Sequence, residues 1–346
     1  MFRRTQTRAL KVGNLPIGGG APVSVQTMAN VDPHDAVALS RQLKVCAERG
    51  CDLFRLTVPD VEAAKVLGEV RKTSPIPLVA DVHFDYRCAL AAIEAGCDAL
   101  RINPGNIGSR DRIAAVVRAA KGKRVPIRIG VNGGSLEKGE TLVSSALKHL
   151  KMLEDEKFHD VILSAKASNA LKTIETYREL AEKTDCPLHL GVTEAGTLLP
   201  GTVRSSVALG ILLADGIGDT IRVSLTNKPE KEVKVGLEIL RSLGLRAPGP
   251  SITSCPTCGR TKVDLVRIAS QVEDALEVLS CDWRGGGFPK VAVMGCVVNG
   301  PGEAKGADIA LCGAEEGFLL YVRGENVGRV SEEDAVRKVL EHVVSL

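Results

Sequence analysis

Near the end of the chain, two cysteines separated by two residues, Cys255 and Cys258, have the spacing of ligands to one metal centre. Pro256 and Gly259 favour a tight turn here, which brings both sulfurs to the same side. A pair of this kind is common in proteins. By itself it predicts a metal site without identifying the metal.

A second stretch, residues 291–303, completes this candidate site. An apolar run leads into a loop rich in glycine and proline, which presents Cys296 and, seven residues later, Glu303. A structural zinc site normally takes four cysteine or histidine ligands, whereas three cysteines can hold three irons of an iron–sulfur cluster and leave the fourth with a harder, exchangeable ligand. We therefore favour a cluster that reacts with a substrate as well as passing electrons. A zinc site with Cys296 and Cys312 as further ligands is the alternative, and the spacing does not decide between the two.

The composition of the 346 residues excludes several classes of protein. A net charge of +3 and only one Trp, three Tyr and six Phe argue against a nucleic-acid partner. The chain contains no apolar run long enough to cross a membrane, and its arginine-bearing first twelve residues lack the apolar segment of a signal peptide. We expect a soluble, cytoplasmic protein that binds neither nucleic acid nor membrane.

Ten cysteines in a chain of this length indicate a reducing compartment, in which thiols stay free or bind a metal. Five of them lie among alanine, leucine and glycine at the ends of predicted elements, where we interpret them as small buried hydrophobes. These are Cys46, Cys51, Cys88, Cys97 and Cys186.

The elements that would position the chemistry form a repeated pattern. It begins after a short glycine-rich hairpin (residues 11–20), which we expect to plug one end of the domain. An apolar strand, a polar loop and an amphipathic helix then alternate eight times. The joins at residues 50–56 and 96–102 repeat closely, and residues 218–223 are a variant. The predicted strands begin near residues 22, 52, 77, 98, 126, 160, 187 and 219.

Eight consecutive strand–helix units predict a TIM (β/α)8 barrel over residues 1–247, with the active site at the carboxyl ends of its strands. An open, doubly wound sheet is the alternative, and the count favours the barrel. A linker rich in proline then leads to residues 248–346, for which we predict a small α+β domain that carries the metal ligands. Its elements are a long helix (262–279), strands near 291–294, 309–311 and 319–322, and a final helix (332–344) capped by Ser331.

Charged and polar residues recur where the barrel strands are predicted to end. Charge at a strand end costs desolvation unless it serves a ligand. Four arginines and a lysine converge there, and arginine presents a planar fork that pairs with phosphate oxygens, so we predict a phosphate or diphosphate substrate. The residues are Arg55, Asp81, His83, Arg101, Asn103, Arg128, Asn132, Lys166, Glu194, Arg222 and Ser224.

Glu194 is an anion in this cationic mouth. It is an acid/base catalyst, an anchor for a substrate hydroxyl or a counter-charge to Arg222, and we favour the first two.

Several stretches together resemble the bacterial 4-hydroxy-3-methylbut-2-enyl diphosphate synthase family of the methylerythritol phosphate route to isoprenoids. The resemblance covers essentially the whole chain, including both cysteine-bearing stretches. The barrel stretches are VADVHF (79–84), LRINPGNIG (100–108), IRIGVN (127–132), HLGVTEAG (189–196) and GDTIRVSL (218–225).

This resemblance implies a [4Fe-4S] cluster held by Cys255, Cys258, Cys296 and Glu303. It implies reductive ring opening of 2-C-methyl-D-erythritol 2,4-cyclodiphosphate, with loss of a hydroxyl as water and electrons from flavodoxin or ferredoxin. The family forms head-to-tail homodimers in which the cluster domain of one subunit caps the barrel mouth of the other. The diphosphate would contact the strand-end residues named above, and Glu194 would deliver a proton to the departing hydroxyl.

Three stretches differ from the sequence that is usual in the family. They lie around Thr27, at Asn169, where an aspartate is often seen, and at Cys312, where small residues are usual. None removes a proposed ligand.

Two rival functions remain at this point. One is a redox-inert barrel that acts on a phosphorylated or pterin-like substrate and carries a zinc-stapled tail. The other is an electron carrier whose cluster never touches a substrate. A zinc protein would be colourless, and a pure carrier would use four cysteines and dispense with Glu303.

Overall fold

The structure is a computed structural model that describes residues 6–247, 249–250, 252–280, 287–298 and 300–346, without the side chains of residues 135, 301, 303 and 304. The chain divides into two compact units, Met1–Arg246 and Ala247–Leu346, each with its own hydrophobic core. The boundary that we predict at residue 248 falls on a residue outside the described ranges. No helix in the described part of the chain is both long enough and apolar enough to cross a membrane.

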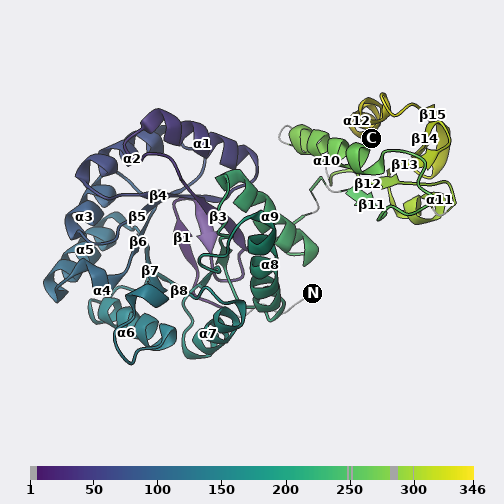
Figure 1. Cartoon of the computed structure of the whole chain (residues 1–346). Coiled ribbons are helices and arrows are strands. Elements are labelled where there is room, and N and C mark those ends of the chain that lie inside the picture. Colours follow the sequence, from purple (N-terminus) through teal and green to yellow (C-terminus); the bar gives the residue numbers. More distant parts are fainter. Residues whose placement is uncertain (1–5, 248, 251, 281–286, 299) are drawn as a thin grey trace. The chain divides into compact units, whose positions relative to one another are not determined.

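The first unit is a TIM barrel, as predicted. Its described strands form an eight-stranded parallel sheet in the order β8-β7-β6-β5-β4-β3-β10-β9, ringed by helices in Figure 1. The strands are β3 (Ser24–Met28), β4 (Leu53–Thr57), β5 (Leu78–Asp81), β6 (Ala99–Ile102), β7 (Ile127–Asn132), β8 (Val161–Lys166), β9 (His189–Leu190) and β10 (Thr220–Ile221). The helices are α1 (Ala36–Glu48), α2 (Val61–Thr73), α3 (Tyr86–Glu94), α4 (Pro104–Ile107), α5 (Arg110–Lys123), α6 (Leu142–Asp155), α7 (Ala170–Lys183), α8 (Leu198–Ala214) and α9 (Pro229–Ser242).

The repeated joins of the sequence form the same hydrogen bond in the structure, at the start of the strands. In each join the aspartate accepts the backbone N–H of a residue at the start of a neighbouring strand. The pairs are Asp52 with Val25 (2.8 Å), Asp98 with Leu78 (2.8 Å) and Asp219 with Leu188 (2.9 Å). Gly50 and Gly96, the first residues of two of these joins, have φ angles of 88° and 89°, a region that residues with a Cβ rarely adopt.

The predicted hairpin at the start of the chain closes the amino-terminal end of the barrel. Strands β1 (Leu10–Val12) and β2 (Leu15–Ile17) pair antiparallel. Leu10, Val12 and Ile17 form a buried cluster with inward-facing residues near the starts of β4, β5, β6 and β8. The plug leaves only the carboxyl end of the barrel open for a ligand.

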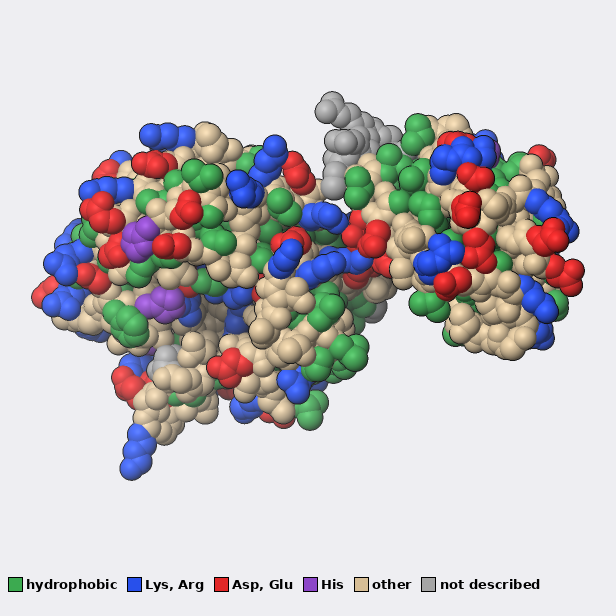
Figure 2. All heavy atoms as spheres, turned by 45° about the horizontal axis from the view of Figure 1, so that its top comes forward, with side chains coloured by type: hydrophobic (Ala, Val, Ile, Leu, Met, Phe, Trp, Pro, Cys, Tyr) green, Lys and Arg blue, Asp and Glu red, His purple; other side chains and the backbone are tan. Residues whose placement is uncertain are grey.

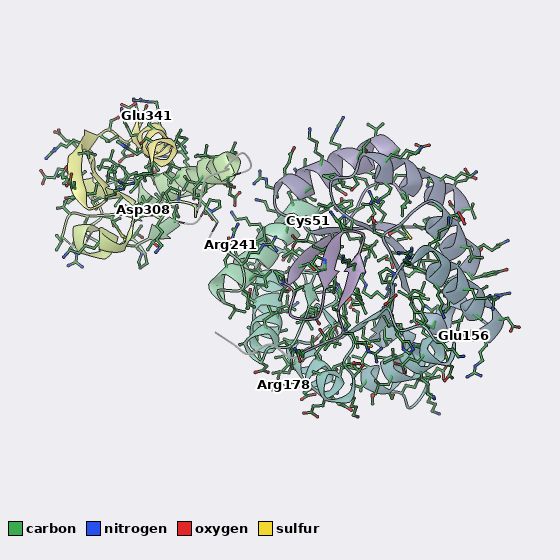
Figure 3. All side chains as sticks on the ribbon, turned by 180° about the vertical axis from the view of Figure 1, so that it is seen from behind. Cys51, Glu156, Arg178, Arg241, Asp308 and Glu341 are labelled. Atoms are coloured by element: carbon green, nitrogen blue, oxygen red, sulfur yellow. The ribbon has the colours of Figure 1, made fainter. Side chains whose placement is uncertain are left out.

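The five cysteines that we predicted to be buried are confirmed as free, buried residues. Burial raises the pKa of Cys46 and Cys97 to about 12, so both are neutral thiols that pack as small hydrophobes. Figure 3 shows Cys51 inside the ring of helices, whereas Glu156 and Arg178 lie on its outer side.

The second unit is a mixed α+β domain. Its described strands have the order β11-β12-β13-β14-β15, of which β11 (Ile252–Ser254), β12 (Val291–Met294) and β13 (Ile309–Ala314) are parallel. Strands β14 (Gly317–Val322) and β15 (Glu325–Val330) continue the sheet antiparallel. Helices α10 (Leu265–Ser280) and α12 (Ala335–Ser345) pack on one face, and the short α11 (Gly300–Glu303) contacts β13.

Three predictions for this unit were incomplete. Neither β11 nor β15 was predicted from the sequence, because β11 has only three residues and β15 is largely exposed and lacks an alternating apolar pattern. The final helix begins at Ala335 instead of Glu332. Residues 332–334 form a turn, and the Asp334 N–H donates to the Ser331 hydroxyl (3.1 Å).

The barrel closes between β8 and β9 with few ladder hydrogen bonds. In the described residues, the recorded contacts across this seam include a parallel bridge between Leu163 and Leu188 and a 2.9 Å bond from the Leu163 N–H to the Pro187 oxygen. The fully buried Tyr177 of α7 adds two hydrogen bonds across this seam. Its hydroxyl accepts the Ala165 N–H (3.1 Å) and donates to the His189 oxygen (2.6 Å).

We predict that Tyr177→Phe lowers the free energy of unfolding by about 2 kcal/mol, because it leaves one buried N–H and one buried carbonyl unpaired. Urea denaturation measures this change. Tyr86→Phe, which keeps the aromatic ring beside Arg112, is the matched control. Equal stabilities of the two variants would contradict a role for the hydroxyl in closing the barrel.

Candidate functional site

A cavity of about 200 Å³ opens at the carboxyl ends of the barrel strands. In Figure 2, blue Lys and Arg side chains are visible within a hollow of this unit. The cavity brings together residues from each barrel strand or from the loop that follows it. Its lining is Met28, Arg55, Asp81, His83, Arg101, Arg128, Val131, Asn132, Ser164, Lys166, Thr193, Arg222 and Ser224.

Nearly all the strand-end residues that we singled out from the sequence lie in this lining. Its described lining contains four arginines and a lysine against one buried carboxylate, Asp81, so the cavity is strongly electropositive. A site with this charge and little room attracts a compact polyanion. Two of the predicted residues, Asn103 and Glu194, lie elsewhere.

Asp81 is the central counter-ion of the mouth. Its carboxylate lies 3.1 Å from Arg101 Nη1, 3.5 Å from Arg55 Nε and 3.8 Å from His83 Nε2. Burial opposes its ionisation, but the guanidinium groups of Arg55 and Arg101 hold its pKa below the usual value. Asp81 is therefore a carboxylate that orients two arginines.

A glycine makes room for one of these arginines. The Arg101 guanidinium lies over Gly130 of β7 and donates to its carbonyl oxygen (3.2 Å). A Cβ added at Gly130 would meet Arg101 Nε at 2.3 Å and Nη2 at 2.6 Å. Position 130 must lack a side chain for the guanidinium to lie where it does.

Glu232, on α9, holds the arginine of the last strand. It pairs with Arg222 through two bonds, Nε to Oε2 (3.2 Å) and Nη2 to Oε1 (3.1 Å). It also accepts the Thr27 hydroxyl (2.7 Å) and the Leu225 N–H (3.0 Å). Among the described residues, the recorded counter-charge of Arg222 is Glu232, so nothing in these contacts supports a pair between Arg222 and Glu194.

Arg128 lies deeper than the sequence analysis indicated, at the second position of β7, and is only 3% exposed. Its Nη1 donates to the Gln26 Oε1 (2.6 Å). Among the described residues, neither Arg128 Nη2 nor Gln26 Nε2 has a hydrogen-bond partner. Burial and the nearby arginines lower the Arg128 pKa well below its usual value. These buried donors suit an anion or ordered water above them.

Lys166, at the end of β8, approaches a buried histidine. Its Nζ lies 3.3 Å from His189 Nε2, and His189 Nδ1 lies 3.2 Å from the Thr220 hydroxyl. Burial and the surrounding arginines lower the pKa of Lys166, and burial and the surrounding cations lower that of His189. The imidazole is therefore neutral.

Glu194 is exposed and lines a second cavity of about 600 Å³ beside the first. Asn132 and Thr193 line both cavities. Glu194 has φ = 54°, the left-handed region, which is uncommon for residues other than glycine and is often found at functional sites. It stands at the rim of the cationic mouth.

Asn103 does not line the mouth. Its side chain is buried, and its Oδ1 caps α4 by accepting the Gly105 N–H (3.1 Å). The predicted contact between Asn103 and a ligand receives no support from the cavity.

Seven residues of this site were not predicted from the sequence, one of which is the apolar Val131 in the cavity lining. Met28, Ser164 and Thr193 line the cavity, and Gln26, His189 and Glu232 support its cations. Alternation along β3, which places Gln26 and Met28 inward, was the available signal for two of them. No local pattern marks Glu232, because it reaches the mouth from the following helix.

Each of the three differences from the usual sequence of the family has a structural explanation. Thr27 donates to Glu232, as described above. Asn169 caps α7 by accepting the Lys172 N–H (3.0 Å), which an aspartate would also do. Cys312 is fully buried beside Met294 and Ala310, and burial raises its pKa to about 11.

In the second unit, three cysteines lie along one edge of the parallel strands. Cys255 follows β11, Cys296 follows β12 after one residue, and Cys258 lies in the turn beyond Cys255. The Cys255 sulfur accepts the Gly295 N–H (3.2 Å). Hydrogen bonds from Arg260 lower the pKa of Cys258 and so favour its thiolate.

This donor set fits a thiolate-bound metal centre. A backbone N–H that donates to a cysteine sulfur and a thiol with a lowered pKa both stabilise the charge that such a centre needs. The Glu303 backbone belongs to α11, and its side chain lies outside the described residues. Among the described residues, no three His, Cys, Asp or Glu side chains are arranged to hold a metal ion, so the cysteines share an edge without forming a closed set.

Comparison with family models gives matches over both units. The GcpE TIM-barrel domain matches residues 7–237, and the GcpE protein C-terminal domain matches residues 251–345. The chain is 52% identical to a 4-hydroxy-3-methylbut-2-en-1-yl diphosphate synthase (flavodoxin) of Symbiobacterium thermophilum, over 99% of this chain and 94% of that protein. It is 50% identical to the protein of the same name from Clostridium perfringens, over the full length of both.

Two solved structures of dihydropteroate synthases each match about two thirds of this chain. Dihydropteroate synthase from Yersinia pestis with a sulfonamide drug covers 69% of this chain and 100% of its own at 13% identity, with a TM-score of 0.51. The Xanthomonas albilineans enzyme in complex with 7,8-dihydropteroate covers 68% of this chain and 98% of its own at 16% identity, with the same score. At these identities the likeness concerns the fold.

We predict that Gly130→Ala weakens the binding of inorganic diphosphate by about tenfold, because the added methyl group displaces the Arg101 guanidinium. Isothermal titration calorimetry measures the affinity. Gly122→Ala, in α5, is the matched control, since nothing lies within 4 Å of its added Cβ. An unchanged affinity in Gly130→Ala would show that Arg101 does not contact the anion.

We also predict that Asp81→Asn lowers the melting temperature but tightens diphosphate binding by about tenfold, because two arginines lose their counter-ion. The folded pKa of Asp81 is lowered, so its stabilising effect is present above the unfolded value of about 3.9 and is lost as the pH falls. The difference in melting temperature between wild type and variant should therefore shrink below about pH 4.

Glu94→Gln, which removes an exposed carboxylate from the outer surface, is the control for the loss of one negative charge. If Asp81→Asn and Glu94→Gln bind diphosphate equally well, Asp81 is not the counter-ion that limits binding.

Proposed function

Because this chain belongs to the GcpE family, we propose that it is an iron–sulfur oxidoreductase that converts 2-C-methyl-D-erythritol 2,4-cyclodiphosphate to 4-hydroxy-3-methylbut-2-enyl diphosphate, in the methylerythritol phosphate route to isoprenoids. The observation that carries the proposal is the cationic mouth of about 200 Å³, in a chain half identical to synthases of that name. Two electrons enter, the ring C–O bond and a C–OH bond break, a C=C bond forms, and the departing hydroxyl takes up one proton to leave as water.

The barrel mouth binds the diphosphate. Arg101 and Arg55, oriented by Asp81, and Arg222, oriented by Glu232, present guanidinium groups to the phosphate oxygens. Arg128 lies at greater depth and adds charge from below, whereas Lys166 adds charge from the end of β8. His83, Asn132 and Ser224 are hydrogen-bond donors around them. Because these groups are held before the ligand arrives, binding costs little reorganisation.

Glu194 is the proposed proton donor. It stands at the rim, next to Asn132 and Thr193, which line the mouth as well. A general acid must lie within hydrogen-bond reach of the group that it protonates, and a side chain at the rim can reach a hydroxyl on the carbon skeleton while the phosphates occupy the interior.

Cys255, Cys258, Cys296 and Glu303 are the proposed ligands of a [4Fe-4S] cluster. The N–H of Gly295 on the Cys255 sulfur and the lowered pKa of Cys258 support thiolate ligands at two of the positions. Cys312 is a poorer candidate, since its raised pKa favours the neutral thiol. When bound, the cluster supplies the electrons for the reduction.

Further proposals concern partners and location. The name of the relatives supports flavodoxin as the electron donor, and ferredoxin is the related alternative. We propose a cytoplasmic head-to-tail homodimer, in which the C-terminal unit of one subunit covers the mouth of the other and excludes water from the reaction.

We predict that anaerobically purified protein is brown, contains about four irons per chain and, with dithionite, converts the cyclodiphosphate to the linear hydroxybutenyl diphosphate. Cys258→Ser should lose the iron and the activity, and Cys97→Ala, at a buried thiol of the barrel, should keep both. Iron analysis and product identification by mass spectrometry test these outcomes. A colourless, zinc-bearing protein would refute the reductive reaction and leave the phosphate mouth in place.

A further inference from the structure

Among the cations of the mouth, Lys166 is held differently from three of the arginines. In the described residues, Arg55 and Arg101 pair with Asp81, and Arg222 pairs with Glu232. No described carboxylate pairs with Lys166. Its recorded partner is a nitrogen of His189, at 3.3 Å.

The contacts of His189 define its protonation state. An ammonium has only donors, so a protonated Lys166 requires His189 Nε2 to be an acceptor. The proton of the neutral ring then lies on Nδ1, which donates to the Thr220 hydroxyl at 3.2 Å. His189 is completely buried at the second-last strand of the barrel, and its backbone oxygen is held by Tyr177.

We infer that His189 is the positioning residue of Lys166: its neutral imidazole accepts the ammonium and aims it at the diphosphate bound in the mouth. This inference rests on the proposed function, because it assigns a role within the same site. It explains why the acceptor is a histidine. A carboxylate would hold the lysine but cancel a positive charge that the ligand needs, whereas a neutral imidazole holds the lysine without cancelling it.

The surroundings keep this acceptor neutral. Burial is the largest cause of the lowered pKa of His189. The charged groups that face the ring are Arg128, Lys166, Arg55 and Arg222, all of which also oppose its protonation. The neighbouring Tyr177 hydroxyl has a raised pKa and stays neutral too. His189 should therefore remain an acceptor at any pH at which Lys166 is protonated.

The backbone fixes the lysine from the other side. A Cβ added at Gly191, after β9, would lie 2.8 Å from both Lys166 Nζ and the Arg222 oxygen. The side chain of Lys166 thus lies against a bare stretch of backbone, with His189 beneath its end. Its position is determined without contact with a carboxylate.

The test compares two amides at position 189. The amide of His189→Gln lies where Nε2 lies and can still accept Lys166, whereas the shorter His189→Asn keeps a polar group only near Nδ1 and Thr220. The fraction of uncharged Lys166 is measured in the free protein by competitive acetylation with acetic anhydride across pH, followed by mass spectrometry. His149→Asn, at another buried histidine outside the mouth, controls for loss of packing.

In His189→Asn the ammonium loses its acceptor, so the pKa of Lys166 should fall, and inorganic diphosphate should bind about tenfold more weakly at pH 7.5. His189→Gln should restore most of both properties. Thr220→Val, which releases the ring to adopt the other tautomer, should change both in the same direction as His189→Asn. His149→Asn should lower the melting temperature without altering Lys166.

Equal acetylation of Lys166 in wild type and His189→Asn would overturn the inference, as would equal defects in the Asn and Gln variants, which would indicate packing alone. The acetylation needs neither substrate nor reductant. A chain that shows the expected acetylation pattern but makes no hydroxybutenyl diphosphate would refute the proposed function and leave the role of His189 intact.

Discussion

Repulsion between like charges is the constraint on which the barrel mouth depends. Five cationic side chains lie around a cavity of about 200 Å³, and each has lost most of its water. The structure holds them with a small set of partners chosen to leave net positive charge: Asp81, Glu232, Gln26 and His189. Two are carboxylates and two are neutral, so the cations are oriented without being neutralised.

The same constraint explains features far from the ligand. Gly130 and Gly191 lack side chains where Arg101 and Lys166 pass the backbone. The hairpin of β1 and β2 seals the opposite end of the barrel with apolar residues, and the aspartates of the repeated joins tie neighbouring strands together near that end. A rigid, sealed wall can hold charges in a fixed array that a flexible loop would allow to separate.

Periodicity was sufficient to predict the eight strands, their order of appearance and the convergence of the strand-end cations, because parallel strands place their carboxyl ends on one rim. Periodicity could not predict which side chains pair with one another across the barrel. Glu232 meets Arg222 from a helix, and Gln26 meets Arg128 across 102 positions of sequence, so neither follows from local spacing. Glu194 was predicted at the mouth and lies at its rim, since the backbone after Thr193 turns through a left-handed conformation.

The small volume of the mouth limits what can lie inside it together with a diphosphate. ATP, ADP and related metabolites carry the same adjacent phosphates as a cyclodiphosphate and are abundant in cells. A cavity of about 200 Å³ has the volume of about seven water molecules, enough for two phosphates and too little for a ribose and a base as well. The sugar and base of a nucleotide would lie outside this volume, towards the neighbouring cavity of about 600 Å³ that Asn132 and Thr193 also line. Charge alone therefore cannot distinguish a cyclodiphosphate from a nucleotide at this mouth, because both carry adjacent phosphates.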